Sequence, residues 1–512
     1  MNWKKETEQI SLRQKLAKAQ GGKEAIELQH KKGRLTLRER IEILVDKDSF
    51  QEQGEIAGGS ELNEKGEIES FTPANFILGF AKINNKPVVV GGEDFTVKGG
   101  SPNPAGLRKS VYTEELALQY KMPLVRLHEG GGGSVAGPAK SMNKGYGGDP
   151  VFSKSRFRSV ADTLKEIPVV SAAVGPVAGL PAARFVASHF RIMTKKTSQI
   201  LVAGPAVVER AFGKLMTKEE LGGSKIHSQN GVADNIAEDE TDAFKQIRQF
   251  LEFFPQNIYE IPERKLSEDP INREQEELLS IVPKDRKKSY EMRDIIKYVF
   301  DEASFFEMTK FFGRGIITGF ARINGYSVGI LANDSNFYAG SMSADGAKKT
   351  ARFVRTCDTF NIPIVSLVDE PGFLIGPEAE SQATILYGTE AVLAVTESTV
   401  PWSTVMIRKS FGVAAAAHYG PDGYVLAWPS AESGPLPLEG GVAVAFKKEI
   451  ESAKDPEAKR KEIEQKMSKN QNPFPRAESF SVHEIIDPRK TRFYLSNWAE
   501  RIQPQMKAKL FK

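Results

Sequence analysis

The segments GFAKINNKPVVVGGEDFTVKGGS (residues 79–101) and GFARINGYSVGILANDSNFYAGS (residues 319–341) decide the fold. They align without a gap at a separation of 240 residues (319 − 79), and nine of the 23 paired positions are identical. Self-similarity at one fixed separation is the signature of a repeated structural unit. The sequence therefore predicts one copy of the same unit in each half of the chain.

The similarity continues beyond these two segments. KMPLVRLHEGGG (from Lys121) aligns with NIPIVSLVDEPG (from Asn361) at the same separation, and IPVVSAAVGPVAG (from Ile167) then resembles VPWSTVMIRKSFG (from Val400) in a shifted register. Short apolar runs such as PVVV and YSVGIL are typical of buried strands, and they alternate with helical stretches such as DGAKKTARFVRTCDTFN. This alternation predicts an α/β fold.

A charged, proline-bearing stretch, PERKLSEDPINREQEE, lies between the two copies. Such composition is typical of a linker. We therefore expect a first domain at residues 1–255, a linker at residues 256–290 and a second domain at residues 291–512.

Composition excludes several classes of function. The formal net charge of +4 over 512 residues gives no concentrated basic surface for nucleic acid. The single cysteine, Cys357, excludes a disulfide framework and a four-cysteine zinc site, and its place in FVRTCDTFN predicts a core residue. The sequence contains no run of about 20 apolar residues, and we do not expect residues 1–20 to act as a signal peptide, because they lack an apolar core. We expect a cytoplasmic protein without a metal, and without a membrane or nucleic-acid partner.

Glycine-rich clusters occur where predicted strands end and the following helices begin. They begin at His128 (HEGGGGSVAG), Val174 (VGPVAGLPAARF), Asp369 (DEPGF) and Lys409 (KSFGVAAAAH). Glycine lets a ligand approach the backbone closely, and two N–H groups aimed at one oxygen form an oxyanion hole. Tight turns would use glycine equally well. Equivalent placement in two repeats nevertheless favours two oxyanion-stabilising sites. The phosphate-loop pattern GxxxxGK[ST], the metal motif HExxH and the hydrolase motif GxSxG are absent from the sequence.

The chain resembles the carboxyltransferase (β) subunits of biotin-dependent acyl-CoA carboxylases over residues 10–505. KKGRLTLRERIEILVDKDSF resembles the family pattern GK-LT-RERI-LLD-GSF, and EDFTVKGGS resembles DFTV-GGS. Two further segments, DGAKKTARFVRTCDTFNIPIVSLVDEPGFLIG and VPWSTVMIRKSFGVAAAAH, resemble the biotin-side segments of the family. The resemblance implies two tandem crotonase-like domains of ββα superhelices and a homohexamer with sites between neighbouring subunits.

The resemblance also implies the site residues. The thioester carbonyl of an acyl-CoA would meet the N–H groups of Gly130 and Gly131 in the first domain. The carbonyl of carboxybiotin, carried by a partner protein, would meet those of Val413 and Ala414 in the second. The other implied contacts are Gly179, Ala416, Gly372 and Phe373 for the substrate, and Gly412 and Gly340 for biotin. Both oxyanion motifs depart from the family pattern, at residues 128–133 and at residues 411–414.

The implied reaction moves a carboxyl group from carboxybiotin to the α-carbon of propionyl-CoA or acetyl-CoA without a protein base. We find no biotin-acceptor AMKM sequence and no ATP-grasp segment, so a biotin carboxylase/carrier subunit is the expected partner. A biotin-dependent decarboxylase or transcarboxylase subunit is the first alternative. A crotonase-type hydratase or hydrolase using Glu129 or Glu370, and a non-catalytic scaffold, are the others. We expect these two glutamates to be surface or helix-capping residues.

Overall fold

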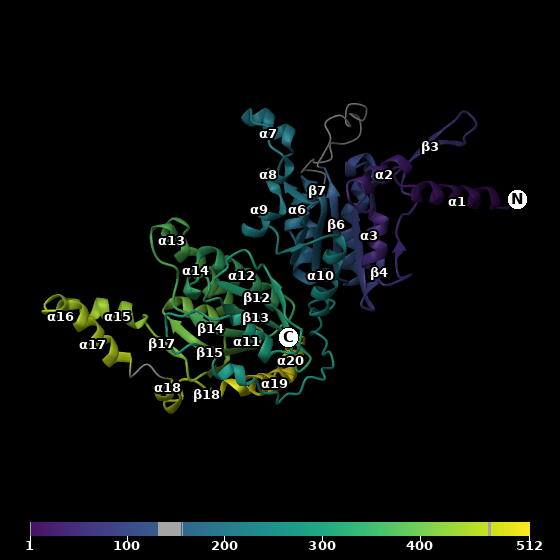
Figure 1. Ribbon diagram of the computed structural model, residues 1–512. Helices are drawn as coiled ribbons and strands as arrows, with labels where there is room; N and C mark the ends of the chain where they lie inside the picture. Colours follow the sequence, from purple (N-terminus) through teal and green to yellow (C-terminus); the bar gives the residue numbers. More distant parts are fainter. Residues whose placement is uncertain (1, 132–154, 156, 469–472, 512) are drawn as a thin grey trace. The chain divides into compact units, whose positions relative to one another are not determined.

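The computed structural model describes all residues except 1, 132–154, 156, 469–472 and 512 (Figure 1). The chain divides into two compact units, Met1–Ile258 and Tyr259–Lys512. Each unit is built on its own eight-stranded sheet. None of the helices in the described ranges has the length and hydrophobicity needed to cross a membrane.

The sheet of the first unit has the order β1-β4-β5-β6-β7-β8-β10, with β9 beside β7. Its strands are β1 Gln51–Glu52, β4 Phe76–Ile83, β5 Lys86–Glu93, β6 Leu124–Gly130, β7 Val169–Ala178, β8 Phe190–Thr194, β9 Gln199–Leu201 and β10 Asn235–Ala237, and β2 Gly58–Leu62 pairs with β3 Ile68–Pro73. Its helices are α1 Lys4–Lys18, α2 Lys23–Lys31, α3 Leu37–Leu44, α4 Pro104–Tyr120, α5 Phe157–Glu166, α6 Leu180–Val186, α7 Pro205–Phe212, α8 Lys218–Gly222, α9 Ser224–Gln229 and α10 Glu240–Glu252, with a 3-10 turn, η1, at Lys98–Gly100.

The sheet of the second unit repeats this order as β11-β12-β13-β14-β15-β16-β18, with β17 beside β15. Its strands are β11 Phe306–Met308, β12 Ile316–Ile323, β13 Tyr326–Asn333, β14 Ile364–Glu370, β15 Trp402–Phe411, β16 Tyr424–Ala427, β17 Glu432–Gly434 and β18 Glu484–Ile485. Its α-helices are α11 Met292–Val299, α12 Ala344–Thr359, α13 Pro377–Ser381, α14 Thr384–Thr396, α15 Leu438–Ala445, α16 Lys447–Glu451, α17 Pro456–Ser468, α18 Phe474–Glu478, α19 Thr491–Arg501 and α20 Gln503–Lys509. Its 3-10 helices are η3 Glu276–Leu279, η4 Tyr338–Gly340, η5 Val413–His418 and η6 Pro488–Lys490.

Each repeat begins with an antiparallel hairpin, β4–β5 in one unit and β12–β13 in the other. Asn84 and Asn85 form the first turn and Asn324 and Gly325 the second, all with positive φ. Such two-residue turns match the twist of the strands and favour Asn and Gly. The helices α4 and α12 then return the chain to parallel strands, where long apolar runs are buried on both faces.

The predicted repeat is confirmed. A separation of 240 residues relates β4 to β12 (316 − 76), β5 to β13 (326 − 86) and β6 to β14 (364 − 124). A separation of 233 relates β7 to β15 (402 − 169) and β9 to β17 (432 − 199). The register therefore shifts in the connection between the end of β6 and the start of β7, which is seven residues longer than its counterpart in the second unit.

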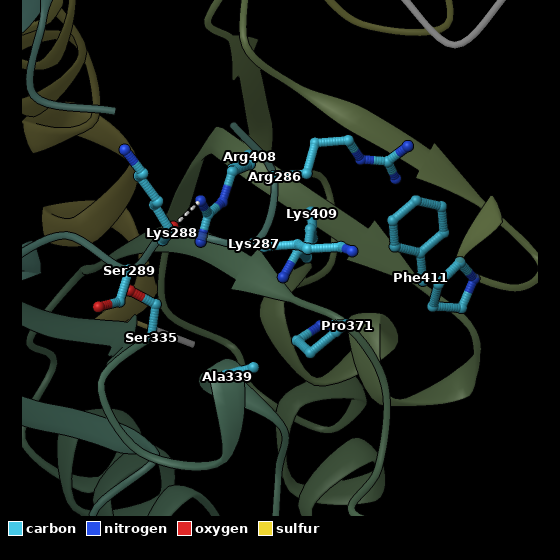
Figure 2. Close-up of a pocket in the computed structure, with 11 residues that line it drawn as sticks. Arg286, Lys287, Lys288, Ser289, Ser335, Ala339, Pro371, Arg408, Lys409 and Phe411 are labelled. Carbon is cyan, nitrogen blue, oxygen red and sulfur yellow. Dashed lines mark hydrogen bonds between the residues drawn. The ribbon is translucent and has the colours of Figure 1, made fainter. Parts of the chain in front are cut away.

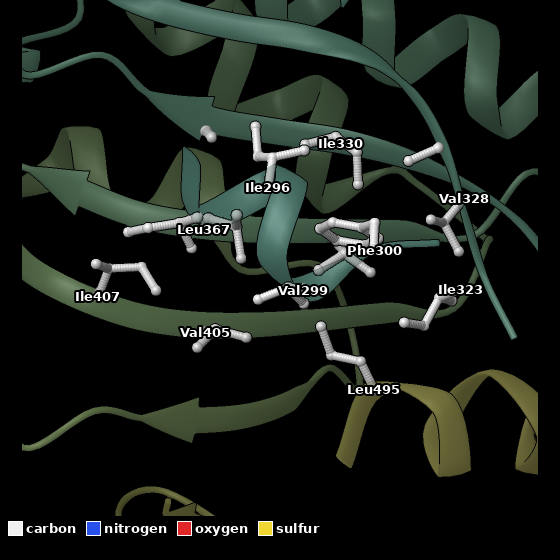
Figure 3. Packing of buried hydrophobic residues seen from close by; sticks show 14 of the residues in the cluster. Ile296, Val299, Phe300, Ile323, Val328, Ile330, Leu367, Val405, Ile407 and Leu495 are labelled. Carbon is white, nitrogen blue, oxygen red and sulfur yellow. The ribbon is translucent and has the colours of Figure 1, made fainter. Parts of the chain in front are cut away.

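The core of the second unit lies between its sheet and the helices α11 and α19 (Figure 3). Ile296 and Phe300 pack there against sheet residues such as Val328 and Ile330. Leu278 also belongs to this core, so residues 259–290, most of the expected linker, are part of the second unit. Cys357 is fully buried, as predicted, and burial raises the pKa of its thiol well above the ordinary value.

Candidate active site

Gly130 and Gly131 lie where β6 ends. Gly130 is packed closely, because a Cβ atom there would lie 3.1 Å from the carbonyl oxygen of Gly100 in η1. Among the described residues, no atom lies within 4 Å of where a Cβ atom on Gly131 would be. In the neighbouring parallel strand, β7 is followed by Gly179 with a φ of 68°, which starts α6. Gly131 and Leu180 of α6 line the same pocket.

The same arrangement closes β15 in the second unit. Gly412 has a φ of 65° and is followed directly by η5, which begins with Val413 and Ala414. The first N–H groups of such a helix have no acceptor within it. The side chain of Val413 is 65% exposed, whereas that of Ala414 is buried. Ala416 lies on the exposed side of η5.

The remaining predicted residues of the second unit gather beside the end of β14. Gly340 closes η4 with a φ of 90°, and a Cβ atom there would lie 2.6 Å from the carbonyl oxygen of Asp369. Gly372 has a φ of 129°. The ring of Phe373 packs against Gly388 of α14, where a Cβ atom would lie 2.5 Å from it. The predicted residues thus form two clusters, one in each unit.

Part of one predicted motif cannot be placed. His128 to Gly131 of the segment at residues 128–133 are described, whereas Gly132 and Gly133 lie outside the described residues. Among the residues that are described, no group of three or more His, Cys, Asp and Glu side chains is arranged to hold a metal.

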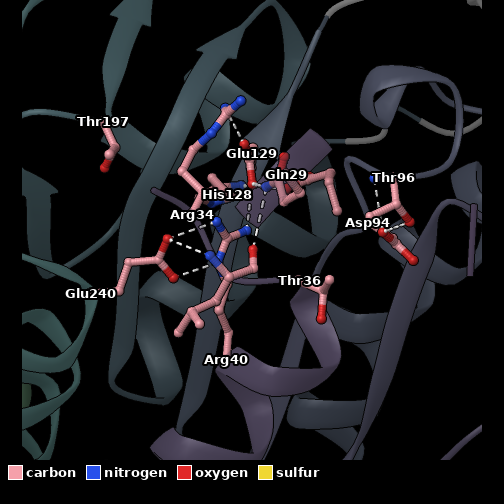
Figure 4. A network of polar contacts seen from close by, with 12 residues as sticks. Gln29, Arg34, Thr36, Arg40, Asp94, Thr96, His128, Glu129, Thr197 and Glu240 are labelled. Atoms are coloured by element: carbon pink, nitrogen blue, oxygen red, sulfur yellow. Dashed lines mark hydrogen bonds and ion pairs between the residues drawn. The ribbon is translucent and has the colours of Figure 1, made fainter. Parts of the chain in front are cut away.

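Glu129 is fully buried in a network of charges in the first unit (Figure 4). Its carboxylate accepts hydrogen bonds from Arg34, from Arg40 at 2.5 Å and from Gln29 at 2.6 Å. Arg40 also pairs with Glu240, at 2.7 and 2.9 Å. Burial raises the pKa of Glu129, and the guanidiniums of Arg40 and Arg34 oppose this rise. The pairing ties α2, α3 and the segment between them to the end of β6.

Space for this carboxylate is provided by Gly175 on β7. A Cβ atom there would lie 2.3 Å from the nearer oxygen of Glu129. The adjacent His128 is also buried, with Nδ1 3.2 Å from Glu93 and Nε2 3.3 Å from the hydroxyl of Ser171. Both ring nitrogens of His128 therefore face polar groups of the first unit.

Glu370 is fully buried in the second unit, with different partners. Its carboxylate accepts hydrogen bonds from the side-chain amide of Asn333 and the backbone N–H of Gly372, both at 2.9 Å. His418 of η5 lies 3.5 Å away through Nε2, and its Nδ1 is 2.9 Å from the hydroxyl of Ser366. Burial raises the pKa of Glu370, and His418 is the main opposing influence.

The expectation that Glu129 and Glu370 are surface or helix-capping residues is wrong. Both side chains have no exposed surface, because each glutamate lies at the end of a buried parallel strand, Glu129 in β6 and Glu370 in β14. Their partners Arg34, Arg40 and His418 were not singled out from the sequence. The two arginines do lie in KKGRLTLRER, the segment that carries the family resemblance.

Comparison with known proteins identifies the family. The family model described as "Carboxyl transferase domain" matches residues 28–510. The propionyl-CoA carboxylase carboxyltransferase subunit of Haloferax mediterranei is 35% identical over 92% of this chain and 91% of its own length. The methylmalonyl-CoA decarboxylase subunit alpha of Veillonella parvula is 35% identical over 94% and 93%, respectively.

Two solved structures are similar to this chain over nearly its whole length. The transcarboxylase 12S structure, described as a hexamer with methylmalonyl-coenzyme A bound, matches with a TM-score of 0.87 and 32% identity, covering 98% of this chain and 96% of that one. A single-chain, multi-domain long-chain acyl-CoA carboxylase matches with a TM-score of 0.81 and 26% identity, over 96% of this chain and 48% of that chain. These matches confirm the predicted crotonase-type fold of the two units. On the family model and these relatives, the chain belongs to the carboxyl transferase family.

Proposed function

We propose that this enzyme transfers a carboxyl group from carboxybiotin, held on a partner protein, to the α-carbon of an acyl-CoA such as propionyl-CoA or acetyl-CoA. One observation carries the proposal: each unit ends a buried parallel strand in glycine-flanked backbone, at Gly130 and Gly131 in the first unit and at Gly412 in the second, and Gly131 lines a pocket. A reaction that develops negative charge on two carbonyl oxygens needs two such sites.

In the first unit, the N–H groups of Gly130 and Gly131 would stabilise the enolate oxygen of the acyl thioester. The position of Gly131 in the wall of a pocket supports this role, because a thioester carbonyl has to reach the backbone. Gly179, at the start of α6, would border the same substrate.

In the second unit, the N–H groups of Val413 and Ala414 would hold the ureido oxygen of biotin. Gly412 fits this role, since its positive φ turns the chain sharply from β15 into η5, and a Cβ atom there would meet only the carbonyl oxygen of Pro435, at 3.5 Å. Gly340 would border this biotin site, whereas Gly372, Phe373 and the small, exposed Ala416 would contact the acyl substrate.

Biotin supplies the carboxyl group and the base, so the chain contributes orientation and electrostatic stabilisation. The environment of Glu129 supports this division, because a carboxylate held by two arginines and an amide is poorly placed to accept a substrate proton. We assign Glu129 a structural role. Glu370 has no arginine partner among the described residues. Its replacement therefore tests most directly whether the protein supplies a catalytic base.

The partner would be a biotin carboxylase/biotin carboxyl carrier subunit, and the chain itself would assemble as a homohexamer. The hexamer described for the transcarboxylase 12S structure supports this assembly. Large apolar side chains lie exposed on α7 and α14 and beside these helices: Val202, Val207, Phe212 and Leu215 in the first unit, and Ile375, Ile385, Leu386 and Leu393 in the second. Exposed apolar surface of this kind is typical of subunit contacts.

A second candidate is carboxyl transfer in the opposite direction, from a malonyl-type CoA ester to biotin. The equal identity to a carboxylase subunit and to a decarboxylase subunit favours keeping it. The two stabilised oxyanions serve both directions equally, since a catalyst stabilises one transition state for both.

The test combines the purified chain with a biotinylated carboxylase subunit, ATP, bicarbonate and a panel of acyl-CoA esters. Carboxylated product should form only when the biotinylated subunit is present. Carboxylation by the isolated chain with ATP and bicarbonate would refute the assignment. Incubation of carboxylated CoA esters with the unloaded biotinylated subunit measures the reverse direction. An active monomer in light scattering would contradict the proposed assembly.

A further inference from the structure

A cavity of about 380 Å³ lies in the second unit beside the carboxyl ends of β14 and β15 (Figure 2). Five of the side chains that line it are cationic: Arg286, Lys287, Lys288, Arg408 and Lys409. The residues that line it include no aspartate or glutamate. Figure 2 shows these cations arranged around the cavity, with Pro371 and Phe411 forming an apolar part of its wall.

Two of the five charges are already balanced. Arg408 pairs with the buried carboxylate of Asp369 at 2.9 Å and donates to the carbonyl of Lys288 at 2.8 Å. Arg286 pairs with Glu432 at 2.6 Å. These contacts fix both guanidiniums and bring the segment before α11 against β15.

The other three cationic side chains are not directly paired with an acid in the part of the chain that the structure describes, although Asp369 and Glu432 lie close enough to influence Lys409. Among the described residues, the ammonium groups of Lys287, Lys288 and Lys409 form no ion pair. Five cations against the two acids leave a net charge of three at the cavity. Lys409 is also partly buried, and burial together with Arg408 and Arg286 lowers its pKa, although Asp369 opposes this shift. Crowded like charges raise the free energy of the empty cavity, and a bound anion would relieve this repulsion.

We propose that the cavity binds a phosphate-type anion, either a phosphate or a pyrophosphate group. The ammonium groups and the hydroxyls of Ser289 and Ser335 offer many donors to tetrahedral oxygens. A single carboxylate would balance only one of three charges, so a multiply charged anion fits better. The apolar wall at Phe411 would accommodate an uncharged part of the ligand. This binding activity goes beyond the proposed carboxyl transfer.

Titration calorimetry of the full-length protein with inorganic pyrophosphate tests the proposal. The Lys287→Gln/Lys288→Gln double variant changes two exposed side chains and should bind at least about tenfold more weakly, since two charge-assisted contacts are lost. Lys447→Gln/Lys448→Gln is the matched control, because it removes the same charge from exposed positions on α16 that do not line the cavity. The control should bind pyrophosphate as the unmodified protein does. Equal weakening in both variants, or no binding by the unmodified protein, would overturn the proposal.

Two further measurements show whether the bound phosphate group belongs to a CoA ester or to a free phosphate compound. If the cavity holds the pyrophosphate of a CoA ester, acyl-CoA will displace inorganic pyrophosphate, and the cavity variant will raise KM for acyl-CoA more than it lowers kcat. If the ligand is a free phosphate compound, pyrophosphate will still bind at saturating acyl-CoA. Either result supports a phosphate site. Because calorimetry requires no carboxyl transfer, failure of this proposal is distinguishable from failure of the proposed function.

Discussion

The acidic residues at the ends of corresponding strands have different partners in the two units. In the first unit, Glu129 near the end of β6 is held by Arg34 and Arg40, which come from the N-terminal helical region. At the equivalent position of the second unit (129 + 240), Asp369 is held by Arg408 of the adjacent strand. The following residue, Glu370, has no arginine and faces His418.

This difference indicates which acids are paired with arginine and which one is not. Glu129 and Asp369 are each fixed by guanidinium groups, which keep their charge at all relevant pH values. Glu370 contacts an amide side chain, backbone N–H groups and a histidine, which favour the charged carboxylate, but burial outweighs them and raises its pKa. The repeat thus keeps its backbone geometry while the acids beside each oxyanion site differ.

The largest effects are expected where backbone N–H groups are removed from either unit. Gly131→Pro and Ala414→Pro each delete one donor. Loss of one oxyanion donor should reduce turnover by about 10²–10³-fold, in the same range for both units. Initial rates with the biotinylated partner measure this effect, and particle size and melting temperature report whether each variant folds.

Gly131→Ala and Ala414→Gly are the matched controls, because each changes the side chain and keeps the N–H group. Gly131→Ala has room for its methyl group, since no atom of the described residues lies within 4 Å. Both controls should lose far less activity than the proline variants. If Glu129→Gln abolishes turnover while Gly131→Pro is well tolerated, acid/base chemistry operates and the carboxyl-transfer mechanism is wrong.

Replacing either of the two buried glutamates should lower the free energy of unfolding, and by different amounts. Glu129→Gln removes the charge that balances Arg34 and Arg40, and breaking a buried pair in this way typically costs about 3–5 kcal/mol. Glu370→Gln leaves no arginine unpaired and disturbs neutral hydrogen bonds, so about 1–2 kcal/mol is expected. Urea unfolding at pH 7 measures both. Equal losses would contradict the assignment of Glu129 as the ionised anchor.

The pH dependence of stability should reveal the titration of Glu370. Burial raises the pKa of Glu370 above 4.5, so the folded state keeps this proton to a higher pH than the unfolded state does. Its contribution to stability is therefore full below about pH 4.5 and decreases as the pH rises through the folded pKa. Glu370→Gln should remove this decrease, which urea unfolding between pH 4 and 8 would detect.

For Glu220, an exposed acid of the first unit, we expect stability to depend on pH in the opposite direction. Hydrogen bonds from the backbone and side chain of Thr217 lower the pKa of Glu220. Its contribution is present above the unfolded pKa and is lost as the pH falls through the folded pKa. Glu220→Gln should therefore matter only at neutral pH. The same direction of pH dependence for Glu220 and Glu370 would contradict both assignments.

Features encoded locally could be predicted from the sequence. The two repeats and the glycine clusters at the strand ends follow from short patterns at fixed separations. The partners of Glu129 could not be predicted, because Arg40 and Arg34 lie 89 and 95 residues away. The basic cavity was missed for the same reason: Lys288 and Arg408, which contact each other, are 120 residues apart. Glycine patterns can mark where backbone sites lie, but only the fold shows which charges surround them.

The smallest effect concerns the N-caps of equivalent helices, Asn103 before α4 and Ser343 before α12. Asn103 accepts from the N–H of Gly106 at 2.7 Å and donates to the carbonyl of Pro73, whereas Ser343 accepts from the N–H of Gly346 at 3.1 Å. Replacement of an N-cap by alanine costs about 1 kcal/mol. Asn103→Ala should lower the free energy of unfolding more than Ser343→Ala does, because it also leaves the carbonyl of Pro73 without its donor. Urea unfolding measures both losses. Equal losses would show that the cap alone determines the stability of both helices, and that the additional contact to Pro73 contributes nothing.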